Sequence, residues 1–587
     1  MTLAGMQRSN TPSETRLRTI DGSSNRDGSM PQPPDDDGSP EALAAYPELS
    51  DGQLARLRAY GSPEALEVGE TAFAAGDPTY DLIVIEQGAI EVVRPATLNA
   101  PEASLVSFGP GAFVGELSLL TGQIAYLTAR VVERARVHRI SPAQLRRLMA
   151  QDPELSDLLL RAFLARRHRL SAGPAARGLQ IIGSELDSAA LALRTYAGRR
   201  VLPHIWLDVD SLEGGSLMRA AALGAEDLPA VIAPDRTLLR ATPGSLARYL
   251  GLAYRQASDT PADLTVIGAG PAGLAAAVYG ASEGLRTILL DASGPGGQAA
   301  SSARIENYVG FPTGLSGAEL AENAVAQAMK FGAQIWTPSE VAALDTESER
   351  LAALLVDGTR DSSKAVIIAT GARYRTLPLY GWEKFEAAGI YYAATELEAR
   401  VCAGQPVTVI GGANAAGQAA LFLASSERLV TLAIRGPDIA AGMSRYLVDR
   451  ILAYSRIEVR AATAITRLEG ERGLERVTLT HRPTGDEESR ACRGLFCFIG
   501  AEPATGWLTR VATDRNGFVL TDVQLAPDDL DETWAALGRS PLPFETSVPA
   551  VFAAGDVRHG SMKRVASAVG EGASAVSSVH RAIGVLS

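Results

Sequence analysis

The stretch that decides the fold is LTVIGAGPAGLAAAVYGASEGLRTILLD, residues 264–291. It predicts an apolar strand, a tight glycine turn, a helix and a second strand that ends in Asp291. In the turn, Gly268 permits the bend, Gly270 lets the backbone approach a phosphate, and Gly273 lets the helix pack closely on the strand. The N–H groups at the helix N-terminus suit a pyrophosphate, and Asp291 can accept a hydrogen bond from a ribose. The stretch therefore predicts a dinucleotide-binding unit.

The part of this stretch from 264 to 281 is also long and uncharged enough to be weighed as a membrane span. Its glycines and the proline at 271 would interrupt a spanning helix near its start. The same residues suit a strand, a turn and a helix in series. We therefore favour the dinucleotide-binding interpretation.

A second unit of the same kind begins at VTVIGGANAAGQAALFLA, residues 407–424. A third element, FAAGDVRHGSMKRVASAVGEG at 552–572, predicts a strand that ends at Gly555 and Asp556 and a helix after Arg564. The N-terminus of that helix is expected to point at a flavin ring. Two dinucleotide folds in one chain indicate FAD together with a nicotinamide cofactor.

Five motifs occur together in the C-terminal half: GAGPAG at 268–273, PGGQ at 295–298, ENYVGFP at 306–312, ATGA at 369–372 and AAGDVR at 553–558. Through them, residues 262–587 resemble a thioredoxin reductase of the low-molecular-weight type. The resemblance implies an NAD(P)H-dependent flavin oxidoreductase with FAD and NADPH as cofactors, acting as a homodimer. It also implies two Rossmann-like domains, one for FAD at 262–375 and 501–587, and one for NAD(P)H at 376–500.

The resemblance assigns cofactor contacts residue by residue. Gln298 and Asn307 would lie at the flavin, Asp556 at the ribityl and phosphate side, and Arg564 with Ala566 at the isoalloxazine. The full set of FAD candidates is Gly268, Gly270, Pro271, Ala272, Gly273, Asp291, Gly297, Gln298, Asn307, Gly371, Gly555, Asp556, Arg564, Val565 and Ala566. The NADPH candidates are Gly411, Gly412, Asn414, Ala415 and Arg435.

The choice between NADPH and NADH depends on the second turn and the strand after it. Where the family has GGGN this chain has GGAN, so Ala413 adds a methyl group where a pyrophosphate should pass. Arg435 follows the strand LVTLAI at the place where NAD-specific folds carry an acid, and an arginine there attracts the 2′-phosphate of NADP. The family's adjacent arginine is Gly436 here, and Arg445 could substitute for it. We favour NADPH, the alternative being that Arg435 is a solvated surface residue.

The redox-active disulfide of the family is missing. Its Cys-x-x-Cys belongs in YYAATE, residues 391–396, where the two positions are Ala393 and Glu396. We interpret Cys402, Cys492 and Cys497 as buried structural thiols. Glu396 is interpreted as a polar loop residue, with proton donation near the flavin as the alternative.

No catalytic residue is assigned, and the electron acceptor is unknown. Two other hypotheses stay open. The first is a non-catalytic sensor that binds flavin and nucleotide, and the second is thioredoxin reduction with cysteines supplied in trans.

The N-terminal third predicts a tail and a ligand module. Residues 1–45 are rich in Ser, Pro, Asp and Gly and are expected to be disordered. Strand-like segments with glycine turns, followed by helical sequence, indicate a β-roll or barrel at 46–172. Within it, VGELSLLTGQIAYLTARV at 114–131 resembles the phosphate-binding cassette of cyclic-nucleotide-binding domains.

That cassette keeps some of the family's ligand residues and lacks another. Gly115 and Glu116 are present, and the glutamate would take the ribose 2′-OH. The arginine that should pair with the cyclic phosphate falls at Ala125, and Arg130 is out of register. Losing that charge-assisted contact would cost about 1.5–3 kcal/mol, so cyclic-nucleotide binding is left open.

A segment from 176 to 254, after a linker at 168–178, resembles a thioredoxin or glutaredoxin domain. It alternates strands and helices, including a helix expected at 217–224, and Pro229 precedes an apolar strand. The loop after its first strand, GSELDSAALA at 183–192, has no cysteine. We therefore expect a docking or spacer role. Altogether the fold class is multidomain: a β-roll, a thioredoxin-like α/β domain and two Rossmann-like domains.

Composition limits the partners. The formal net charge of −12 over 587 residues argues against nucleic acid or an anionic membrane as the main partner. Three cysteines in so long a chain argue against a disulfide framework, and no apolar leader precedes the tail. We expect a cytoplasmic protein with no metal site.

Overall fold

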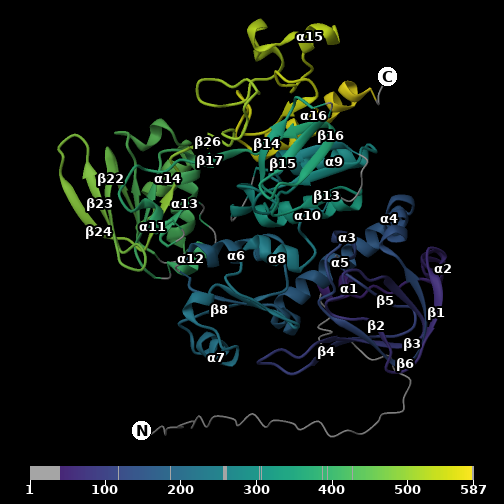
Figure 1. Ribbon diagram of the computed structural model, residues 1–587. Coiled ribbons are helices and arrows are strands. Elements are labelled where there is room, and N and C mark those ends of the chain that lie inside the picture. The colour runs from purple at the N-terminus through teal and green to yellow at the C-terminus, as the bar shows by residue number, and fades with distance from the viewer. Residues whose placement is uncertain are drawn as a thin grey trace, which may run out of the picture.

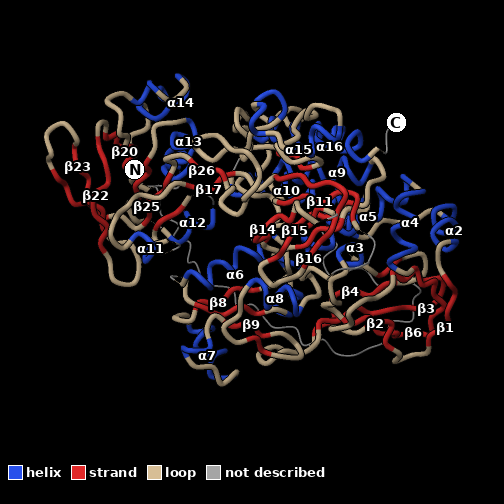
Figure 2. The backbone as a smooth tube through the Cα atoms, turned by 45° about the horizontal axis from the view of Figure 1, so that its top comes forward, coloured by secondary structure: helices blue, strands red, loops and turns tan. Residues whose placement is uncertain are grey.

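The computed structural model describes residues 40–584, apart from 117, 186, 256–260, 303–304, 306, 349, 387, 393, 395, 403 and 426–427. The chain forms four units, the last of them inserted into the third, and Figures 1 and 2 agree on their arrangement. A thioredoxin-like unit lies between the N-terminal β-roll and the green unit that carries the second glycine turn. The unit with the first glycine turn lies above it in Figure 1.

The N-terminal unit, residues 40–172, is a β-roll flanked by helices. Its sheet has the order β1–β6–β3–β4, while β2 pairs with β6 and β5 pairs with β3. These described strands do not close into a barrel, so the roll is the correct one of the two alternatives. The strands are β1 Ser62–Leu66, β2 Thr71–Phe73, β3 Leu82–Arg94, β4 Ala103–Phe108, β5 Phe113–Val114 and β6 Thr128–Ile140; the helices are α1 Pro40–Ala45, α2 Asp51–Ala59, α3 Ser118–Thr121, α4 Pro142–Gln151 and α5 Pro153–Ala172.

Two sequence predictions at the ends of this unit were wrong. Helix α1 falls within the tail predicted to be disordered, because Ala42 and Ala45 are buried and the Nε of Arg166 donates to the carbonyl O of Ala45 at 2.8 Å. The first residues of the linker predicted at 168–178 are helical instead. Helix α5 continues to Ala172, where Gly173 ends it, and the 3₁₀ helix η1 spans Pro174–Gly178.

The next unit has the strand order β10–β9–β7–β8, with β7 parallel to β8 and antiparallel to β9. This is the strand order of the thioredoxin fold, as the sequence pattern predicted. The second helix begins at Leu212 rather than at 217, because the Ser211 hydroxyl accepts from the backbone N–H of Gly214 at 2.9 Å and starts it there. The elements are β7 Gln180–Gly183, α6 Ser188–Arg199, β8 Ile205–Asp208, α7 Leu212–Ala220, β9 Ala230–Ile232, β10 Thr237–Leu238 and α8 Pro243–Tyr249.

The third unit contains the first glycine turn and is completed by the C-terminus; we call it the FAD unit. Its mixed sheet has the order β13–β12–β11–β16–β15–β14, and β27 pairs in parallel with β16. Helices α9 and α16 pack side by side on it, since a Cβ on Gly572 would overlap the carbonyl O of Ala272. The elements are β11 Ala262–Ile267, α9 Pro271–Ser282, β12 Thr287–Leu290, η3 Ala299–Ser301, α10 Gly317–Lys330, β13 Gln334–Trp336, β14 Val341–Asp345, β15 Leu351–Leu355, β16 Arg360–Ile368, α15 Glu532–Leu537, β27 Val551–Ala553 and α16 Val565–Ile583.

The fourth unit, here called the nicotinamide unit, is inserted into the FAD unit. Its parallel sheet has the order β18–β25–β19–β20–β21, and a three-stranded antiparallel sheet β22–β23–β24 lies beside it. Strands β17 and β26 pair with each other where the chain enters and leaves. The elements are β17 Ala372–Tyr374, α11 Trp382–Phe385, β18 Ile390–Tyr391, α12 Glu396–Val401, β19 Val407–Ile410, α13 Asn414–Ser425, β20 Val430–Ala433, α14 Arg445–Leu452, β21 Ile457–Arg460, β22 Thr463–Glu469, β23 Arg476–His481, β24 Glu487–Ala491, β25 Gly494–Cys497 and β26 Ala501–Pro503.

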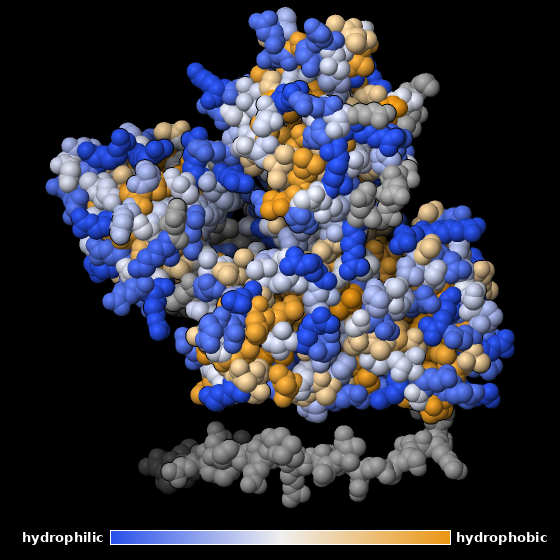
Figure 3. Space-filling view, viewed as in Figure 1, coloured by the Kyte–Doolittle hydropathy of each residue, from blue (hydrophilic) through white to orange (hydrophobic). Residues whose placement is uncertain are grey.

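The β-roll unit packs directly on helix α10 of the FAD unit. Met329 of α10 belongs to the hydrophobic core of the roll, and Lys330 Nζ lies 2.6 Å from Asp157 Oδ1. Hydrophobic residues gather over the thioredoxin-like unit on the face shown in Figure 3, and the exposed Leu212 belongs to this unit. Within the described residues, no helix is long and apolar enough to cross a membrane.

Candidate functional site

The first glycine turn joins β11 to α9 and has the geometry of a phosphate cradle. Gly268 has φ +108°, and a Cβ there would overlap the carbonyl O of Ala369. A Cβ on Gly273 would overlap the carbonyl O of Gly268, so helix and strand touch there. At Gly270 no atom lies within 4 Å of an added Cβ, which leaves the backbone open to a ligand.

The helix after this turn leaves its first N–H groups free for an anion. Gly270 is the N-cap of α9 and has no side chain to cap it, and Pro271 and Ala272 form the first turn. Because the first N–H groups of a helix have no intrahelical partner, they can donate to phosphate oxygens. The cradle therefore fits the pyrophosphate of FAD.

Asp291 sits where β12 ends and holds two loops together. Its Oδ2 accepts from the backbone N–H of Ala269 at 2.8 Å, and its Oδ1 accepts from the N–H groups of Ser293 and Gly294 at 2.8 Å each. The structure thus places the carboxylate at the glycine turn and gives it a supporting role that the sequence did not predict. Its contact with a ribose stays a prediction.

The PGGQ loop packs against the same turn. The N–H of Gly296 donates to the carbonyl O of Ala269 at 2.7 Å, and a Cβ on Gly297 would lie 2.9 Å from Cα of Gly270. The Gln298 side chain donates to the carbonyl O of Ala372. Asn307 is exposed in the following bend, and its flavin contact also stays a prediction.

The C-terminal motif closes the cradle from the other side. Gly555 has φ +78°, and a Cβ there would lie 2.8 Å from Cβ of Ala272. Burial raises the pKa of the neighbouring Asp556 carboxyl, Lys563 opposes this shift and Glu571 adds to it. Gly371 lies nearby with φ +67° and open space around it.

Helix α16 starts with the predicted flavin-facing residues. Arg564 is its exposed N-cap and provides no side-chain cap, so the N–H groups of Val565 and Ala566 are available to a ligand. Sequence reasoning missed Glu571 of this helix. Its carboxylate accepts from the N–H of Gly555 at 2.8 Å and from Arg558 at 2.9 Å, which fixes the motif on α16.

The second glycine turn, between β19 and α13, has the same geometry as the first. A Cβ on Gly411 would overlap the carbonyl O of Phe498, whereas nothing lies within 4 Å of a Cβ on Gly412. Asn414 Oδ1 accepts from the N–H of Ser444 at 2.7 Å, and Ala415 is exposed in the first turn of the helix. Ala413 is exposed too, so the expected effect of its methyl group on a pyrophosphate stays a prediction.

The residues expected to read the 2′-phosphate lie at the surface. Arg435 is exposed just after β20, and Arg445, at the start of α14, pairs with Asp449 at 3.3 Å. The Ser444 Oγ is buried and has no hydrogen-bond partner among the described residues.

The segment that lacks the dithiol runs between β18 and α12. Ala393 lies outside the described residues, and Glu396 begins α12, so it belongs to a helix and not to the loop expected from the sequence. The three cysteines are free and buried. Burial raises the pKa of Cys402 to about 12 and that of Cys492 to about 11, and it also raises the pKa of Cys497.

We expect all three thiols to be inert in the native protein, because only a thiolate reacts and burial disfavours it. A thiol reagent should label none of them before denaturation and all three afterwards. Fast labelling of one thiol in the folded protein would contradict their assignment as structural.

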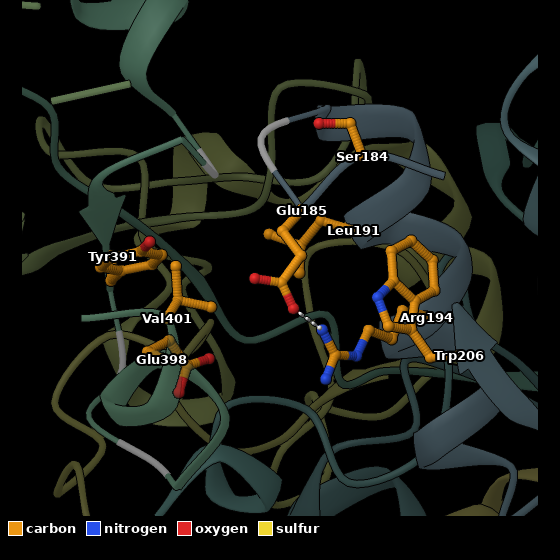
Figure 4. Close-up of a pocket in the computed structure, with 8 residues that line it drawn as sticks. All are labelled: Ser184, Glu185, Leu191, Arg194, Trp206, Tyr391, Glu398 and Val401. Atoms are coloured by element: carbon orange, nitrogen blue, oxygen red, sulfur yellow. Dashed lines mark hydrogen bonds and ion pairs between the residues drawn. The ribbon is translucent and has the colours of Figure 1, made fainter. Parts of the chain in front are cut away.

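The thioredoxin-like unit lies against residues of the nicotinamide unit on both sides of the dithiol-less segment. Figure 4 shows the loop after its first strand, with Ser184 and Glu185, facing Tyr391, Glu398 and Val401 of the nicotinamide unit. The cavity left between them measures about 10 Å³, room for about one water molecule. The loop that would carry a thioredoxin's dithiol thus faces residues that flank positions 393 and 396, and neither the loop nor those two positions have cysteine.

In the cassette of the β-roll, the glutamate and the arginine considered from the sequence are both engaged by neighbouring side chains. Glu116 accepts from the Tyr80 hydroxyl at 3.4 Å, and a Cβ on Gly115 would lie 2.7 Å from Leu119 Cδ1. Arg130 is paired with Glu91 and with Glu102 at 3.1 Å each.

The position of the missing arginine is buried, and its neighbour contacts another unit. Ala125 is 2% exposed, and its methyl group supplies no charge. The N–H of Ile124 donates to the carbonyl O of Leu250 at 3.1 Å, so the cassette docks on the thioredoxin-like unit. Among the described residues, no group of three or more His, Cys, Asp or Glu could hold a metal ion.

Comparison with known proteins agrees with this organisation. Residues 262–572 match the family of pyridine nucleotide-disulphide oxidoreductases, and residues 63–152 match the cyclic nucleotide-binding domain. A thioredoxin reductase of Treponema pallidum (strain Nichols) is 33% identical over 54% of this chain and 95% of its own length. A bifunctional thioredoxin reductase/thioredoxin of Mycobacterium leprae is 29% identical over 55% of this chain and 66% of its own. The crystal structure of Lactococcus lactis thioredoxin reductase in the FR conformation is 27% identical, covers 55% of this chain and all of its own, and gives a TM-score of 0.49.

Proposed function

Because the chain belongs to the pyridine nucleotide-disulphide oxidoreductase family, with thioredoxin reductases as relatives, we propose that it passes electrons from NADPH to an acceptor other than an active-site disulfide. The thioredoxin reductases are oxidoreductases that use FAD and NADPH. When bound, FAD supplies the hydride-accepting chemistry, and the protein supplies binding and orientation. Our proposal concerns the identity of the electron acceptor and the route by which electrons reach it.

One contrast carries the proposal: both nucleotide cradles are intact while the sulfur chemistry is missing. Gly270 and Gly412 each leave open space for a phosphate. The described thiols are buried and their pKa values are raised by burial, and the sequence has no cysteine at 393 or 396. Anaerobic reduction of the flavin by NADPH tests this contrast, as set out in the Discussion.

The contact between the thioredoxin-like and nicotinamide units supports an acceptor that does not use this face. Thiol–disulfide exchange needs sulfur atoms in contact. Here the thioredoxin-like unit leaves only about 10 Å³ next to Tyr391, Glu398 and Val401. We propose that electrons leave from the flavin directly, to oxygen, a quinone, a dye or a protein.

For the nicotinamide we expect Arg435 to favour NADPH over NADH. Its exposed guanidinium follows β20 where a 2′-phosphate would lie, and one charge-assisted contact is worth about 1.5–3 kcal/mol. Arg435→Ala should therefore raise KM for NADPH roughly tenfold or more and leave KM for NADH unchanged. Arg467→Ala, which removes another exposed arginine of the same unit, is the matched control. Equal losses with both cofactors would contradict this role.

Helix α10 supports regulation by the N-terminal unit. Its C-terminal end contacts the β-roll through Met329, and at its N-terminal end the N–H of Gly317 donates to the carbonyl O of Ser302 at 2.9 Å. Ala321 of the helix packs on Gly296, since a Cβ there would lie 2.7 Å from the alanine's Cβ. One rigid helix thus joins the β-roll to the loop at the FAD cradle. This observation also favours the second candidate function, a sensor that reports flavin occupancy to the N-terminal units.

For the cassette we expect weak or no binding of cyclic AMP and cyclic GMP. Ala125 gives no cation and Arg130 is paired with Glu91 and Glu102, so a cyclic phosphate would lose its main charge partner. Calorimetry on the full chain should show no micromolar binding. Micromolar affinity would show that another cation does the pairing, and Arg167→Ala, near Glu116, would then identify it.

We further propose that the protein acts as a homodimer in the cytoplasm. We propose the dimer because thioredoxin reductases suggest one. The location is supported by the three free thiols, which suit a reducing compartment.

A further inference from the structure

The C-terminal turn of α6, in the thioredoxin-like unit, is fixed to the FAD unit. Tyr196 is 1% exposed, and its hydroxyl donates to the carbonyl O of Thr337 at 2.9 Å. Thr337 directly follows Trp336, the last residue of β13, whose carbonyl O accepts from the N–H of Asp291 at 3.2 Å. The helix is therefore held at the strand ends beside the cradle.

Arg199 follows Tyr196 by three residues and so lies on the same side of the helix. Its Nη1 donates to Ser293 Oγ at 3.3 Å, and a Cβ on Gly294 would lie 3.3 Å from the Cβ of Arg199. Ser293 and Gly294 are the two residues whose N–H groups donate to Asp291 Oδ1. The guanidinium thus reaches the loop that connects Asp291 to the PGGQ turn.

The same guanidinium is close to the flavin side of the cradle. Burial raises the pKa of Tyr374 to about 12, Arg199 opposes this shift, and Asp556 adds to it. Arg199, Tyr374 and Asp556 therefore share one electrostatic neighbourhood. The Ser293 contact lies on the loop after Asp291, so Arg199 lies between that loop and the neighbourhood of Asp556.

The loops around the first glycine turn are short of positive charge, since GAGPAG, PGGQ and ATGA contain no cation. The C-terminal motif and the chain after it contribute Arg558, Lys563 and Arg564. Arg558 is already paired with Glu571 at 2.9 Å, and the resemblance assigns Arg564 to the isoalloxazine. A pyrophosphate carries negative charge and binds more tightly to a charged donor than to backbone N–H groups alone.

We propose that Arg199 is an FAD-binding residue, whose guanidinium donates to the pyrophosphate and makes the cysteine-free thioredoxin-like unit one wall of the flavin site. This gives that unit a function that needs no redox chemistry. It also makes flavin affinity depend on how the N-terminal half of the chain is docked.

Arg194 of the same helix is the matched control. It has the same charge, but it pairs with Glu185 at 3.4 Å and stacks on the ring of Trp206, away from the cradle. Its replacement removes one cation from α6 without touching the loop at 293 and 294.

The test is a calorimetric titration of the full-length apoprotein with FAD, ADP and adenosine. Arg199→Ala should weaken FAD and ADP by roughly 10- to 100-fold, the loss of one charge-assisted contact, and leave adenosine unchanged. Arg199→Lys should retain part of the affinity, and Arg194→Ala should bind all three probes like the wild type.

Thermal melts of the apoproteins separate binding from folding. If Arg199→Ala does not fold, Arg199→Gln and Arg199→Lys compared with each other decide the matter, because only the lysine keeps the charge. Unchanged FAD affinity in a folded neutral variant would overturn the proposal. Equal weakening of adenosine and ADP would also overturn it, because the contact would then be at the nucleoside and not at the pyrophosphate.

Discussion

Replacing Gly270 with valine is expected to give a folded but colourless protein. No atom lies within 4 Å of a Cβ at this position, so the side chain disturbs no packing. The added methyl groups would instead occupy the space where a pyrophosphate meets the backbone and the α9 N-terminus. We expect FAD affinity to fall by about two orders of magnitude or more. The measurement is flavin content after purification, followed by titration of the apoprotein with FAD.

The second cradle supplies the matched control. Gly412 is equally open, so Gly412→Val should fold, stay yellow and lose binding of NADPH. Gly270→Val should therefore lose FAD, whereas Gly412→Val should keep FAD and lose NADPH. Gly273→Val is not a useful substitute, because its side chain would overlap the carbonyl O of Gly268 and unfold the turn. A yellow Gly270→Val protein with unchanged affinity would remove the FAD site from this turn.

Thioredoxin is expected to be a very poor substrate, reduced no faster than in the absence of the protein. The described cysteines are buried, and burial raises their pKa values, so none provides an attacking thiolate. In the same preparation a dye or oxygen should still support NADPH oxidation. The measurement compares NADPH consumption with each acceptor under identical conditions.

Cys402→Ser is the control for a relocated redox centre. Its thiol is fully buried, so the variant should keep both the dye activity and the lack of thioredoxin activity. Rapid thioredoxin reduction by the wild type that disappears in Cys402→Ser would show that this cysteine does the work of the missing pair.

The parts of the fold that the sequence predicted are those governed by local backbone chemistry. The turns at Gly268 and Gly411 and the strand–turn–helix order around them follow from positive φ angles and close packing. The thioredoxin-like strand order followed from alternating apolar segments. Errors were at boundaries, such as α7, where the cap at Ser211 outweighed the apolar pattern.

The candidate site was less predictable where its residues come from distant elements. Glu571 lies sixteen residues after Gly555, with which it bonds, and Arg199 comes from another unit. Nothing in the local sequence indicates such partners, because tertiary packing alone brings them together. The burial of Ala125 against a neighbouring unit was invisible for the same reason.

The central claim is that electrons pass from NADPH to FAD in a chain that has no second redox centre. Its most direct test is an anaerobic titration of the full-length protein with NADPH, followed by flavin absorbance. Because NADPH and FAD exchange the same number of electrons, we predict complete bleaching with about one equivalent of NADPH per flavin. Bleaching that needs about two equivalents would reveal a second redox centre such as a disulfide. No bleaching at all would show that NADPH does not reduce the flavin. Either result would contradict the claim.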